Sequence, residues 1–401
     1  MADRIIYVDH AGTTPVHPQV AAAMHPYFTE QFGNPSSLHG LGAASADAVD
    51  DARTAIAEAL KARAGEIIFT SGGSESINTA LKGVAFAQQL AGAGQRIVST
   101  PIEHHAVLHT LEYLERFGFE TVLVGVDSDG RVDPDEVAAA VDEGTVLVSV
   151  MLANNEVGAV QPIAEIARAL AARGESLGRR IPFHTDAVQG AGQLGLDVQA
   201  LGVDLLSLSA HKFHGPKGAG ALYLRRGTPF LAQQTGGGQE RNRRAGTENV
   251  PGIVGMGQAL RISEAARERF VPRVSALRDH FLDRTLQEIP GAILNGPGTS
   301  RLPNNANVRF ENVDGQLLLE ALDNVGIAAS SGSACTTSSW EPSHVLLAMG
   351  CDQDAAAGSL RVTLGPENTV EEMDFIVDQL IRIVPELRGD AVASEATGTP
   401  A

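Results

Sequence analysis

The sequence predicts an α/β protein, with a mostly parallel, seven-stranded sheet covered by helices and then a smaller α+β domain. From about residue 43 to residue 225, segments with helical periodicity alternate with short apolar runs. This alternation is typical of a parallel sheet that is covered on both faces. After about residue 260 the alternation gives way to one long amphipathic segment and several mixed elements. A chain of 401 residues is also long enough for two domains.

The first part of the chain supplies the strands of the large sheet and the helices between them. Apolar residues that recur every three or four positions predict helices at 43–62, 74–91, 106–117, 134–141 and 163–173. Short apolar runs predict strands at 66–70, 96–100, 120–124, 145–151, 181–185, 203–208 and 219–224. Ligands of such sheets bind beyond the carboxyl ends of the strands, so the polar residues that follow each strand are candidate site residues.

The second part of the chain begins with a long amphipathic stretch. Its periodicity predicts one helix over 262–288, strands at 306–310 and 359–363, and helices at 315–324, 343–349 and 370–384. We therefore expect a large ligand-binding domain over residues 13–260 and a small domain built from 1–12 and 261–388. Residues 389–401 are small and polar, and we expect them to be a disordered tail.

Charge and cysteine content restrict the partners and the compartment. The formal net charge of −18 argues against nucleic acid and anionic membranes, which call for a basic surface. The only two cysteines are Cys335 and Cys351, so there is no disulfide framework and a reducing cytosol fits best. The sequence shows neither a signal peptide nor a run of about 18 apolar residues, and a cytoplasmic location is expected.

Lys212 lies in a Gly/Pro-rich turn between the predicted strands 203–208 and 219–224. A lysine held between two buried strands is costly unless it is paired, neutralised or used covalently. The covalent use is a Schiff base, the usual anchor of pyridoxal 5′-phosphate (PLP). Most lysines, however, lie on exposed turns, and this segment alone favours neither interpretation.

Asp186 ends the predicted strand 181–185, and Gln189 follows three residues later. The pyridine nitrogen of PLP must stay protonated to withdraw electrons, and a buried carboxylate beside it maintains that proton. An aspartate after a strand is more often a helix N-cap. A candidate Schiff-base lysine one strand later makes the catalytic interpretation the better one.

The segment 70–75 joins a strand to a helix through Gly72, Gly73 and Ser74. Free backbone N–H groups and the helix dipole make such a junction an anion site, so Gly73 and Ser74 are candidate phosphate ligands. Ser209 and His211, which flank the lysine region, are further candidates. The alternative is ordinary helix capping by Ser74 or Ser76.

Two other groups of polar residues follow predicted strands. His105 and His109 have helical spacing that permits zinc, but no ligand set accompanies them. His104, directly after a strand end, is better placed to stack on a cofactor ring and to move protons. Asn155 lies in a polar run after the strand 145–151, which is also ordinary turn chemistry.

Cys335 occupies the centre of a small, polar run over residues 330–339. Structural cysteines are usually buried in apolar surroundings, whereas a thiol in such a run is a candidate nucleophile. A Gly/Ser linker with an incidental cysteine is the alternative. Cys351, beside Met349 and Gly350, is interpreted as a packing residue at the end of a helix.

Together these residues identify a family. The chain resembles the cysteine desulfurases of the class-V PLP fold, in the group with a long cysteine-bearing loop. The resemblance covers nearly the whole chain and rests on ordered motifs, which are Tyr7-Val8-Asp9, Thr13-Thr14-Pro15, Phe32-Gly33-Asn34-Pro35-Ser36, Thr70-Ser71-Gly72, Glu75-Ser76, Glu103-His104, Asn154-Asn155-Glu156, Asp186 with Gln189, Ser209 with His211-Lys212, residues 236–240, residues 244–247, residues 331–335 and Arg361. It implies the type I fold of PLP-dependent transferases.

The resemblance also implies a role for each candidate residue. Lys212 is the Schiff-base lysine and proton carrier, Asp186 and Gln189 contact the ring, and His104 stacks on it. Other implied cofactor ligands are Gly73, Ser74, Asn155, Ser209 and His211, with Thr247 supplied by the second subunit of a homodimer. Arg361 holds the substrate carboxylate with Asn155 and Asn34, and Cys335 receives the sulfur.

The implied reaction is conversion of L-cysteine to L-alanine with a persulfide on Cys335, which a sulfur-acceptor or scaffold protein then receives. The acceptor pathway is iron–sulfur cluster assembly or another thiolation. No resident metal is implied, although Cys335 is a possible transient ligand of a cluster. The alternatives are a selenocysteine lyase or other C–S lyase, an aminotransferase of the same fold, and a non-catalytic interaction protein. Intact Lys212, Asp186, His104 and Arg361 argue against the last.

Overall fold

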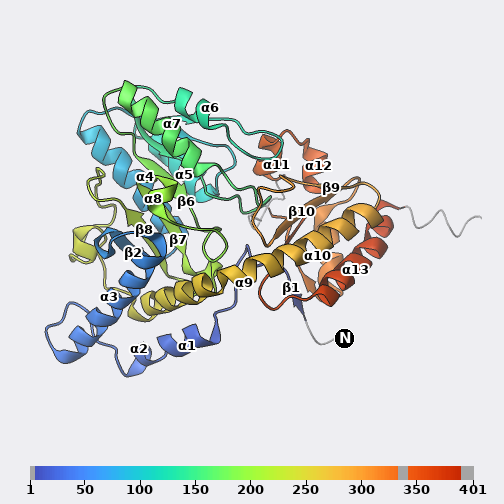
Figure 1. Ribbon diagram of the computed structural model, residues 1–401, viewed down its shortest axis with the longest axis horizontal. Helices are drawn as coiled ribbons and strands as arrows, with labels where there is room; N and C mark the ends of the chain where they lie inside the picture. Colours follow the sequence, from blue (N-terminus) through green and yellow to red (C-terminus); the bar gives the residue numbers. More distant parts are fainter. Residues whose placement is uncertain (1–4, 333–341, 390–401) are drawn as a thin grey trace, which may run out of the picture.

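The computed structural model describes residues 5–332 and 342–389. A seven-stranded sheet lies in the larger part of the molecule and two small sheets lie in the other part (Figure 1). Cys335 and the tail from residue 390 onward lie outside the described residues.

The large sheet has the strand order β2-β8-β7-β6-β5-β3-β4. Strand β8 is antiparallel to both of its neighbours, and the other pairings are parallel. The predicted mostly parallel, seven-stranded sheet is therefore confirmed. Its strands are β2 (Ile67–Thr70), β3 (Arg96–Ser99), β4 (Glu120–Leu123), β5 (Thr145–Ser149), β6 (Phe183–Asp186), β7 (Leu205–Ser209) and β8 (Gly220–Leu224).

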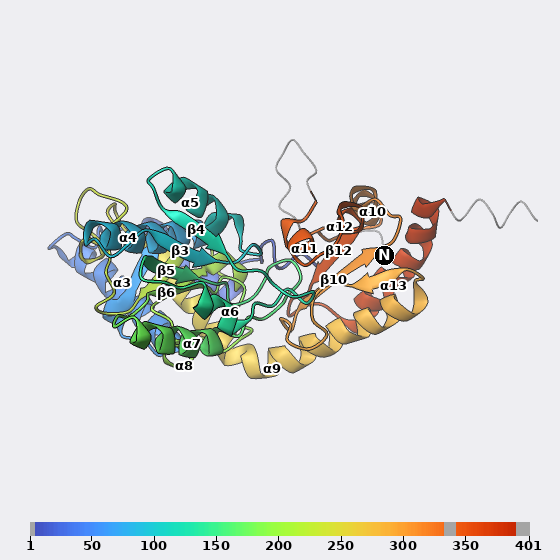
Figure 2. The same ribbon diagram turned by 90° about the horizontal axis from the view of Figure 1, so that it is seen from above.

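Helices cover both faces of this sheet, as Figure 2 shows. Successive strand residues point to opposite faces, so Ile67 and Phe69 pack into one apolar cluster while Ile68 packs into another. One face packs against α3 (Gly40–Leu60), α7 (Ile163–Ser176) and the start of α9, and the other against α4 (Gly73–Leu90) and α5 (His105–Glu115). Shorter elements complete this part, namely α1 (Pro18–Met24), α2 (Pro26–Thr29), η1 (Ala64–Glu66), α6 (Pro134–Ala139), α8 (Val198–Leu201), η2 (Ala210–Lys212) and η3 (Glu240–Asn242).

Helix α9 (Val250–Glu288) connects the two parts of the molecule (Figure 1). Its first half packs on the large sheet and its second half belongs to the core of the smaller part. The helix begins twelve residues before the predicted residue 262, because glycines at 252, 255 and 257 weaken the helical pattern. At least one of them has a packing reason, since a Cβ on Gly257 would lie 2.9 Å from the Cα of Ala52.

The smaller part contains both N-terminal and C-terminal residues. A parallel pair joins β1 (Ile6–Tyr7) to β11 (Ile327–Ala328), and β10 (Asn305–Phe310) lies between β12 (Ser359–Thr363) and β9 (Ala292–Leu294) in an antiparallel sheet. The helices are α10 (Gly315–Asp323), α11 (His344–Ala348), α12 (Gln353–Ala357) and α13 (Val370–Arg388). The division at residues 12/13 and 260/261 stays a prediction.

In the described part of the chain, none of the helices combines the length and apolarity that crossing a membrane requires.

The contact between α3 and α9 generates a stability prediction. Ile56 of α3 is 0% exposed in the core beneath the large sheet. Ile56→Ala should lower the free energy of unfolding by about 2–5 kcal/mol, because it removes apolar contacts and leaves a cavity. The measurement is a urea unfolding curve monitored by circular dichroism. Glu58→Ala, on the exposed face of the same helix, is the control, and an equal shift in both variants would contradict this assignment of the core.

Candidate active site

A cavity of about 400 Å³ lies at the carboxyl ends of β5, β6 and β7, beside the smaller part of the molecule. Most of the residues singled out from the sequence line it, which are Gly73, Ser74, His104, Asn155, Asp186, Gln189, Ser209, His211, Lys212 and Arg361. They come from distant parts of the chain, so the parallel sheet and its contact with β12 bring them together.

Lys212 ends the short helix η2, which follows β7 directly. Its Nζ donates hydrogen bonds to the carbonyl oxygens of Ala11, at 2.5 Å, and Gly12, at 2.8 Å. Burial and the nearby Arg361 lower the pKa of Lys212 to about 8, although Asp9 and Asp186 act in the opposite direction. A larger share of its amino groups is therefore neutral near pH 7 than for an exposed lysine, and a neutral amine is a nucleophile and a base.

Asp186 is the last residue of β6, and its side chain is buried. Its Oδ1 accepts a hydrogen bond from the Val188 N–H at 2.9 Å. Burial raises the pKa of Asp186 to about 6, which the Val188 hydrogen bond and Lys212 counteract. A carboxylate in this position stabilises a cation that is placed beside it. Nearby, Gln189 donates from Nε2 to the Ala11 carbonyl at 3.1 Å.

The turn between β2 and α4 has the form of an anion site. Helix α4 is 18 residues long, and its N-cap is Gly72, without a side-chain cap. A Cβ on Gly73 would lie 3.4 Å from the Cβ of Ser209 and 3.0 Å from Val188, so only a glycine leaves this cradle open. Helix capping by the serines is not what the structure shows, because α4 has no side-chain cap hydrogen bond. The Ser76 hydroxyl instead donates to the Ala221 carbonyl at 3.0 Å and lies 2.8 Å from Ser207 Oγ.

His104 is the N-cap of α5 and faces the same cavity. Its Nδ1 accepts the Ala106 N–H at 3.0 Å, so the neutral ring carries its proton on Nε2. Burial is the main reason that the pKa of His104 falls to about 4, and the charges of Lys212, His105, His344 and His109 lower it further. His104 is therefore neutral near pH 7.

Two further histidines, His105 and His344, line the cavity, and His109 lies behind His105. The His105 ring lies 5.0 Å from that of His109 and 4.7 Å from that of His344. Within residues 5–332 and 342–389, no group of three or more His, Cys, Asp or Glu side chains has the arrangement of a metal site.

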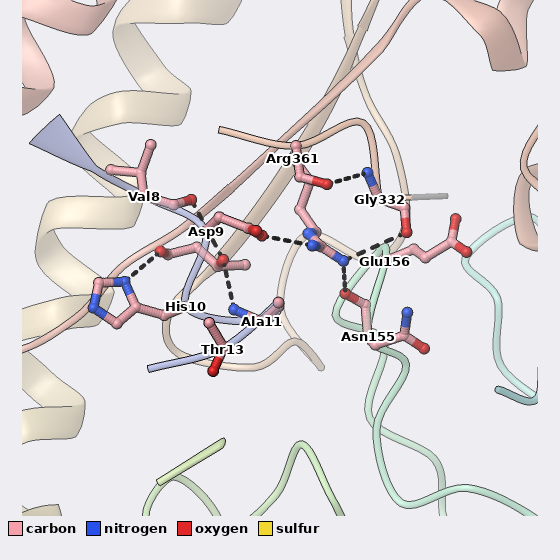
Figure 3. A network of polar contacts seen from close by, with 12 residues as sticks. Val8, Asp9, His10, Ala11, Thr13, Asn155, Glu156, Gly332 and Arg361 are labelled. Atoms are coloured by element: carbon pink, nitrogen blue, oxygen red, sulfur yellow. Dashed lines mark hydrogen bonds and ion pairs between the residues drawn. The ribbon is translucent and has the colours of Figure 1, made fainter. Parts of the chain in front are cut away.

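Arg361 of β12 lines the cavity from the smaller part of the molecule. Figure 3 shows its guanidinium pointing toward Asp9 and Asn155. Its Nη2 pairs with Asp9 Oδ1 at 2.7 Å, and its Nη1 donates to the Asn155 carbonyl at 2.9 Å and the Gly332 carbonyl at 3.5 Å. The buried Nε has no hydrogen-bond partner. A buried guanidinium with an unused donor is suited to bind a carboxylate.

Two of the sequence-predicted residues that the structure describes, Asn34 and Thr247, do not line this cavity. Asn34 is exposed, and its Oδ1 caps the Ser36 N–H at 3.0 Å. Thr247 is exposed as well. Cys335 lies outside the described residues, but Gly332 lines the cavity three residues before it.

Two carboxyl groups did not receive a role from the sequence, namely Asp9, which lines the cavity, and Glu103, which accepts a hydrogen bond from the cavity residue Met151. Asp9 belongs to a noted motif, but its pairing with Arg361 joins residues 352 positions apart. Glu103 is 0% exposed, and its Oε1 accepts hydrogen bonds from Thr100 Oγ1 at 2.9 Å and the Met151 N–H at 2.8 Å. Burial raises the pKa of Glu103 to about 8, so it is mostly protonated at pH 7. Its position after a strand, beside His104, was the available signal.

Taken together, the cavity offers a nucleophilic amine, a carboxylate for a cation, a turn for an anion and a guanidinium for a carboxylate. These functions suit a phosphorylated, cationic aromatic ligand and an amino acid side by side.

Comparisons with known proteins agree with this chemistry. Residues 6–376 match the family Aminotransferase class-V. The chain is 48% identical over 385 residues to the cysteine desulfurase IscS of Dictyoglomus turgidum, covering 96% of each protein. It is 49% identical over 386 residues to the cysteine desulfurase IscS of Methanosarcina thermophila, covering 96% of this chain and 93% of that protein.

Solved structures give the same result. A NifS-like protein superposes with a TM-score of 0.88 at 39% identity, covering 96% of this chain and all of that one (100%). The protein SspA in complex with cysteine superposes with a TM-score of 0.79 at 36% identity, covering 91% of this chain and 100% of that one.

The lowered pKa of Lys212 generates a testable prediction. In ligand-free protein, an amine-selective reagent should label Lys212 with a half-maximal pH near 8 instead of 10.5, because the neutral amine is the reactive form. Arg361→Gln should move this midpoint upward, since it removes a positive charge, and Asp186→Asn should move it downward. Peptide mass spectrometry after timed labelling measures the midpoint. A wild-type midpoint that stays near 10.5 would contradict the burial of this amine.

Proposed function

The chain belongs to the class-V aminotransferase family and is a cysteine desulfurase, and we propose that it uses PLP at Lys212 to convert L-cysteine to L-alanine while Cys335 takes the sulfur. The observation that carries this proposal is the meeting of Lys212, Asp186, His104 and Arg361 with an anion-binding turn around one cavity. The intact set also argues against a non-catalytic protein of the same fold.

The residues present fit PLP. The open cradle at Gly73 and the uncapped start of α4 suit its phosphate, with Ser74, Ser209 and His211 beside it. Asp186 suits the protonated ring nitrogen, Gln189 the ring oxygen, and His104 and Asn155 complete the wall. Lys212 is the amine that would hold the cofactor. When bound, PLP supplies an aldehyde that condenses with amines and a cationic ring that withdraws electrons from the substrate α-carbon.

Lys212 moves the proton of the substrate. Its buried amino group, with a pKa of about 8, is a base strong enough to take a proton from an acidified α-carbon and weak enough to return it. The neutral His104 has an N–H group at Nε2 that can donate a hydrogen bond. Because it carries no positive charge, it does not disfavour the protonated form of Lys212. Asp186 keeps its negative charge when a cation lies against it, because the attraction lowers its raised pKa.

Arg361 orients the substrate through its carboxylate. Its unpartnered Nε and the Asp9-paired Nη2 lie on one guanidinium, which is buried at 5% exposure. Asp9 offsets part of the positive charge while the site is free, so the cost of burying Arg361 is reduced. The Asn155 carbonyl holds Nη1 and thereby fixes the plane of the guanidinium.

Cys335 accepts the sulfur atom in a balanced exchange. Its thiolate attacks the sulfur of the substrate, a new S–S bond forms, and the substrate Cβ–S bond breaks. The electron pair of that bond stays on Cβ, which gains a proton and becomes the methyl group of alanine. One cysteine and one thiol therefore give one alanine and one persulfide, and no external oxidant is required.

The exposed positions of Asn34 and Thr247 support a homodimer in which each subunit completes the site of the other. Apolar side chains near Asn34 are also exposed, namely Phe28, Phe32, Leu38 and Leu41. Such a group of apolar residues on a surface is typical of a protein interface. The loop that carries Asn34 contacts the segment before Thr247, since Gln239 Nε2 donates to Ser36 Oγ at 2.6 Å. We further propose a cytoplasmic location and a sulfur-acceptor protein, in iron–sulfur cluster assembly or another thiolation pathway.

Cys335→Ala tests the sulfur transfer. Alanine release from L-cysteine should fall by at least about a hundredfold, because no thiol remains to accept the sulfur. Cys351→Ser is the matched control and should keep its activity, since Cys351 is a free cysteine that does not line the cavity. The measurements are alanine by chromatography and persulfide by mass spectrometry. Retained alanine release in Cys335→Ala would favour a C–S lyase or selenocysteine lyase, and a keto acid product would favour an aminotransferase.

Lys212→Ala tests the cofactor anchor. The purified protein should lose the yellow colour of a lysine-bound aldehyde, and turnover should fall by about 10²–10⁴-fold, because both the covalent anchor and the proton carrier are gone. Lys217→Ala, which changes an exposed lysine of the same turn, is the control for colour and activity. Absorbance spectra and alanine release measure the two effects. An unchanged visible spectrum would show that another residue holds the aldehyde.

A further inference from the structure

Strand β2 leads directly into the turn that the proposed function assigns to phosphate, and it is an edge strand. Among the strands of residues 5–332 and 342–389, it pairs with β8 alone. A buried edge must find partners for its backbone groups, because an unpaired N–H or C=O away from water is costly. The direction of the turn at residues 70–75 depends on how this edge is held.

Two side chains take the place of a neighbouring strand. Arg53 of α3 donates from Nη1 to the Ile67 carbonyl at 3.0 Å, and Glu240 accepts the Phe69 N–H on Oε2 at 3.2 Å. The two side chains also pair with each other through Nη1–Oε2 at 2.8 Å and Nη2–Oε1 at 2.9 Å. The pair thus supplies one donor and one acceptor to alternate residues of β2, as an adjacent strand would.

The surroundings of this pair show that its geometry is demanding. Arg53 is 6% exposed and Glu240 is 5% exposed, and the Arg53 guanidinium lies 4.7 Å from the centre of the Phe69 ring. Glu240, Arg241 and Asn242 have φ values of 47°, 57° and 63°. Three consecutive non-glycine residues in the left-handed region persist only where the surrounding contacts hold them. The contacts of Glu240 therefore stabilise a strained segment against β2.

The same segment also reaches the turn itself. Arg244 pairs with Glu75 through Nε–Oε1 at 2.9 Å and Nη2–Oε2 at 3.3 Å. Glu75 Oε2 accepts the Ser71 N–H at 2.8 Å. Residues 240–244 are consequently connected to β2 at Phe69 and to the turn at Ser71, on both sides of Thr70.

We propose that Arg53 and Glu240 are positioning residues for the cofactor phosphate, because they hold the free edge of β2 and with it the turn at Ser71–Ser74. Neither residue lines the cavity. This inference rests on the proposed function, since it concerns the phosphate of PLP. It predicts that changes at Arg53 and Glu240 weaken the binding of a ligand that has a phosphate. A purely structural role would instead weaken the binding of every ligand of the cavity.

The test compares PLP with pyridoxal, which has the same aldehyde and ring but no phosphate. Full-length protein is stripped of cofactor and titrated with each aldehyde, and the absorbance of the bound form gives the two dissociation constants. In Arg53→Met the affinity for PLP should fall by about tenfold. A loss of this size commonly follows when a residue that holds a binding residue in place is removed. The affinity for pyridoxal should stay within about twofold of wild type.

Two conservative variants keep the test informative if Arg53→Met does not fold. Glu240→Gln keeps an acceptor for the Phe69 N–H but loses the negative charge. Arg53→Lys keeps the positive charge but loses the bidentate contact with Glu240. Both should show a smaller loss of PLP affinity than Arg53→Met, again without a change for pyridoxal. Thermal unfolding of each variant separates this effect from general destabilisation.

Asp204→Asn is the matched control. Asp204 is a buried carboxylate that pairs with Arg225 at 3.0 Å and accepts the Phe183 N–H at 3.1 Å, at the opposite end of the sheet from the cavity. It should lower the melting temperature without changing the ratio of the two affinities. An equal loss for PLP and pyridoxal in the Arg53 and Glu240 variants, or no loss for either, overturns the inference. Wild-type protein that binds neither aldehyde overturns the proposed function as well.

Discussion

The site depends on the contacts that the guanidinium of Arg361 makes with both parts of the molecule. This guanidinium is buried between the two parts of the molecule and contacts Asp9, the Asn155 carbonyl and the Gly332 carbonyl (Figure 3). Breaking a buried pair commonly costs 3–5 kcal/mol, roughly, because the remaining charge has no partner. These contacts therefore hold the N-terminal segment, the residues after β5 and strand β12 in one arrangement. They also shape the cavity, since each of these segments contributes part of its wall.

The same guanidinium contributes to the electrostatics of Lys212. Burial and, after it, the charge of Arg361 lower the pKa of Lys212. Lys212 in turn adds to the effect of burial in lowering the pKa of His104, and it moderates the pKa of Asp186, which burial raises. Near neutral pH this favours a lysine that is partly neutral and a histidine that is neutral. A cationic ligand ring beside Asp186 would then complete the charge balance, and the substrate carboxylate would bind to the remaining face of Arg361. Binding and proton transfer thus depend on one set of coupled charges.

Much of the fold was accessible from the sequence, whereas the supporting contacts of the site were not. Alternating apolar runs located all seven strands of the large sheet, and polar residues after these strands, such as Asp186 and Ser209, line one cavity. The start of α9 was placed too late because glycines there weaken the helical pattern, and one of them, Gly257, allows close packing against Ala52. Glu103 was named in a motif but received no role, because its complete burial is not suggested by a charged residue type.

Periodicity and local motifs, which report on neighbours within a few residues, by themselves predicted the parallel sheet and marked the turn at residues 70–75 and Lys212 as candidate site elements. Only the tertiary structure decided which distant groups pair. Arg361 meets Asp9 across 352 positions and Arg53 meets Glu240 across 187. Such pairs depend on how helices and sheets pack in space, and many arginines and glutamates along the chain have the same local pattern. The sequence therefore indicated the groups to which we assign the chemistry, and the packing selected the groups that hold them in position.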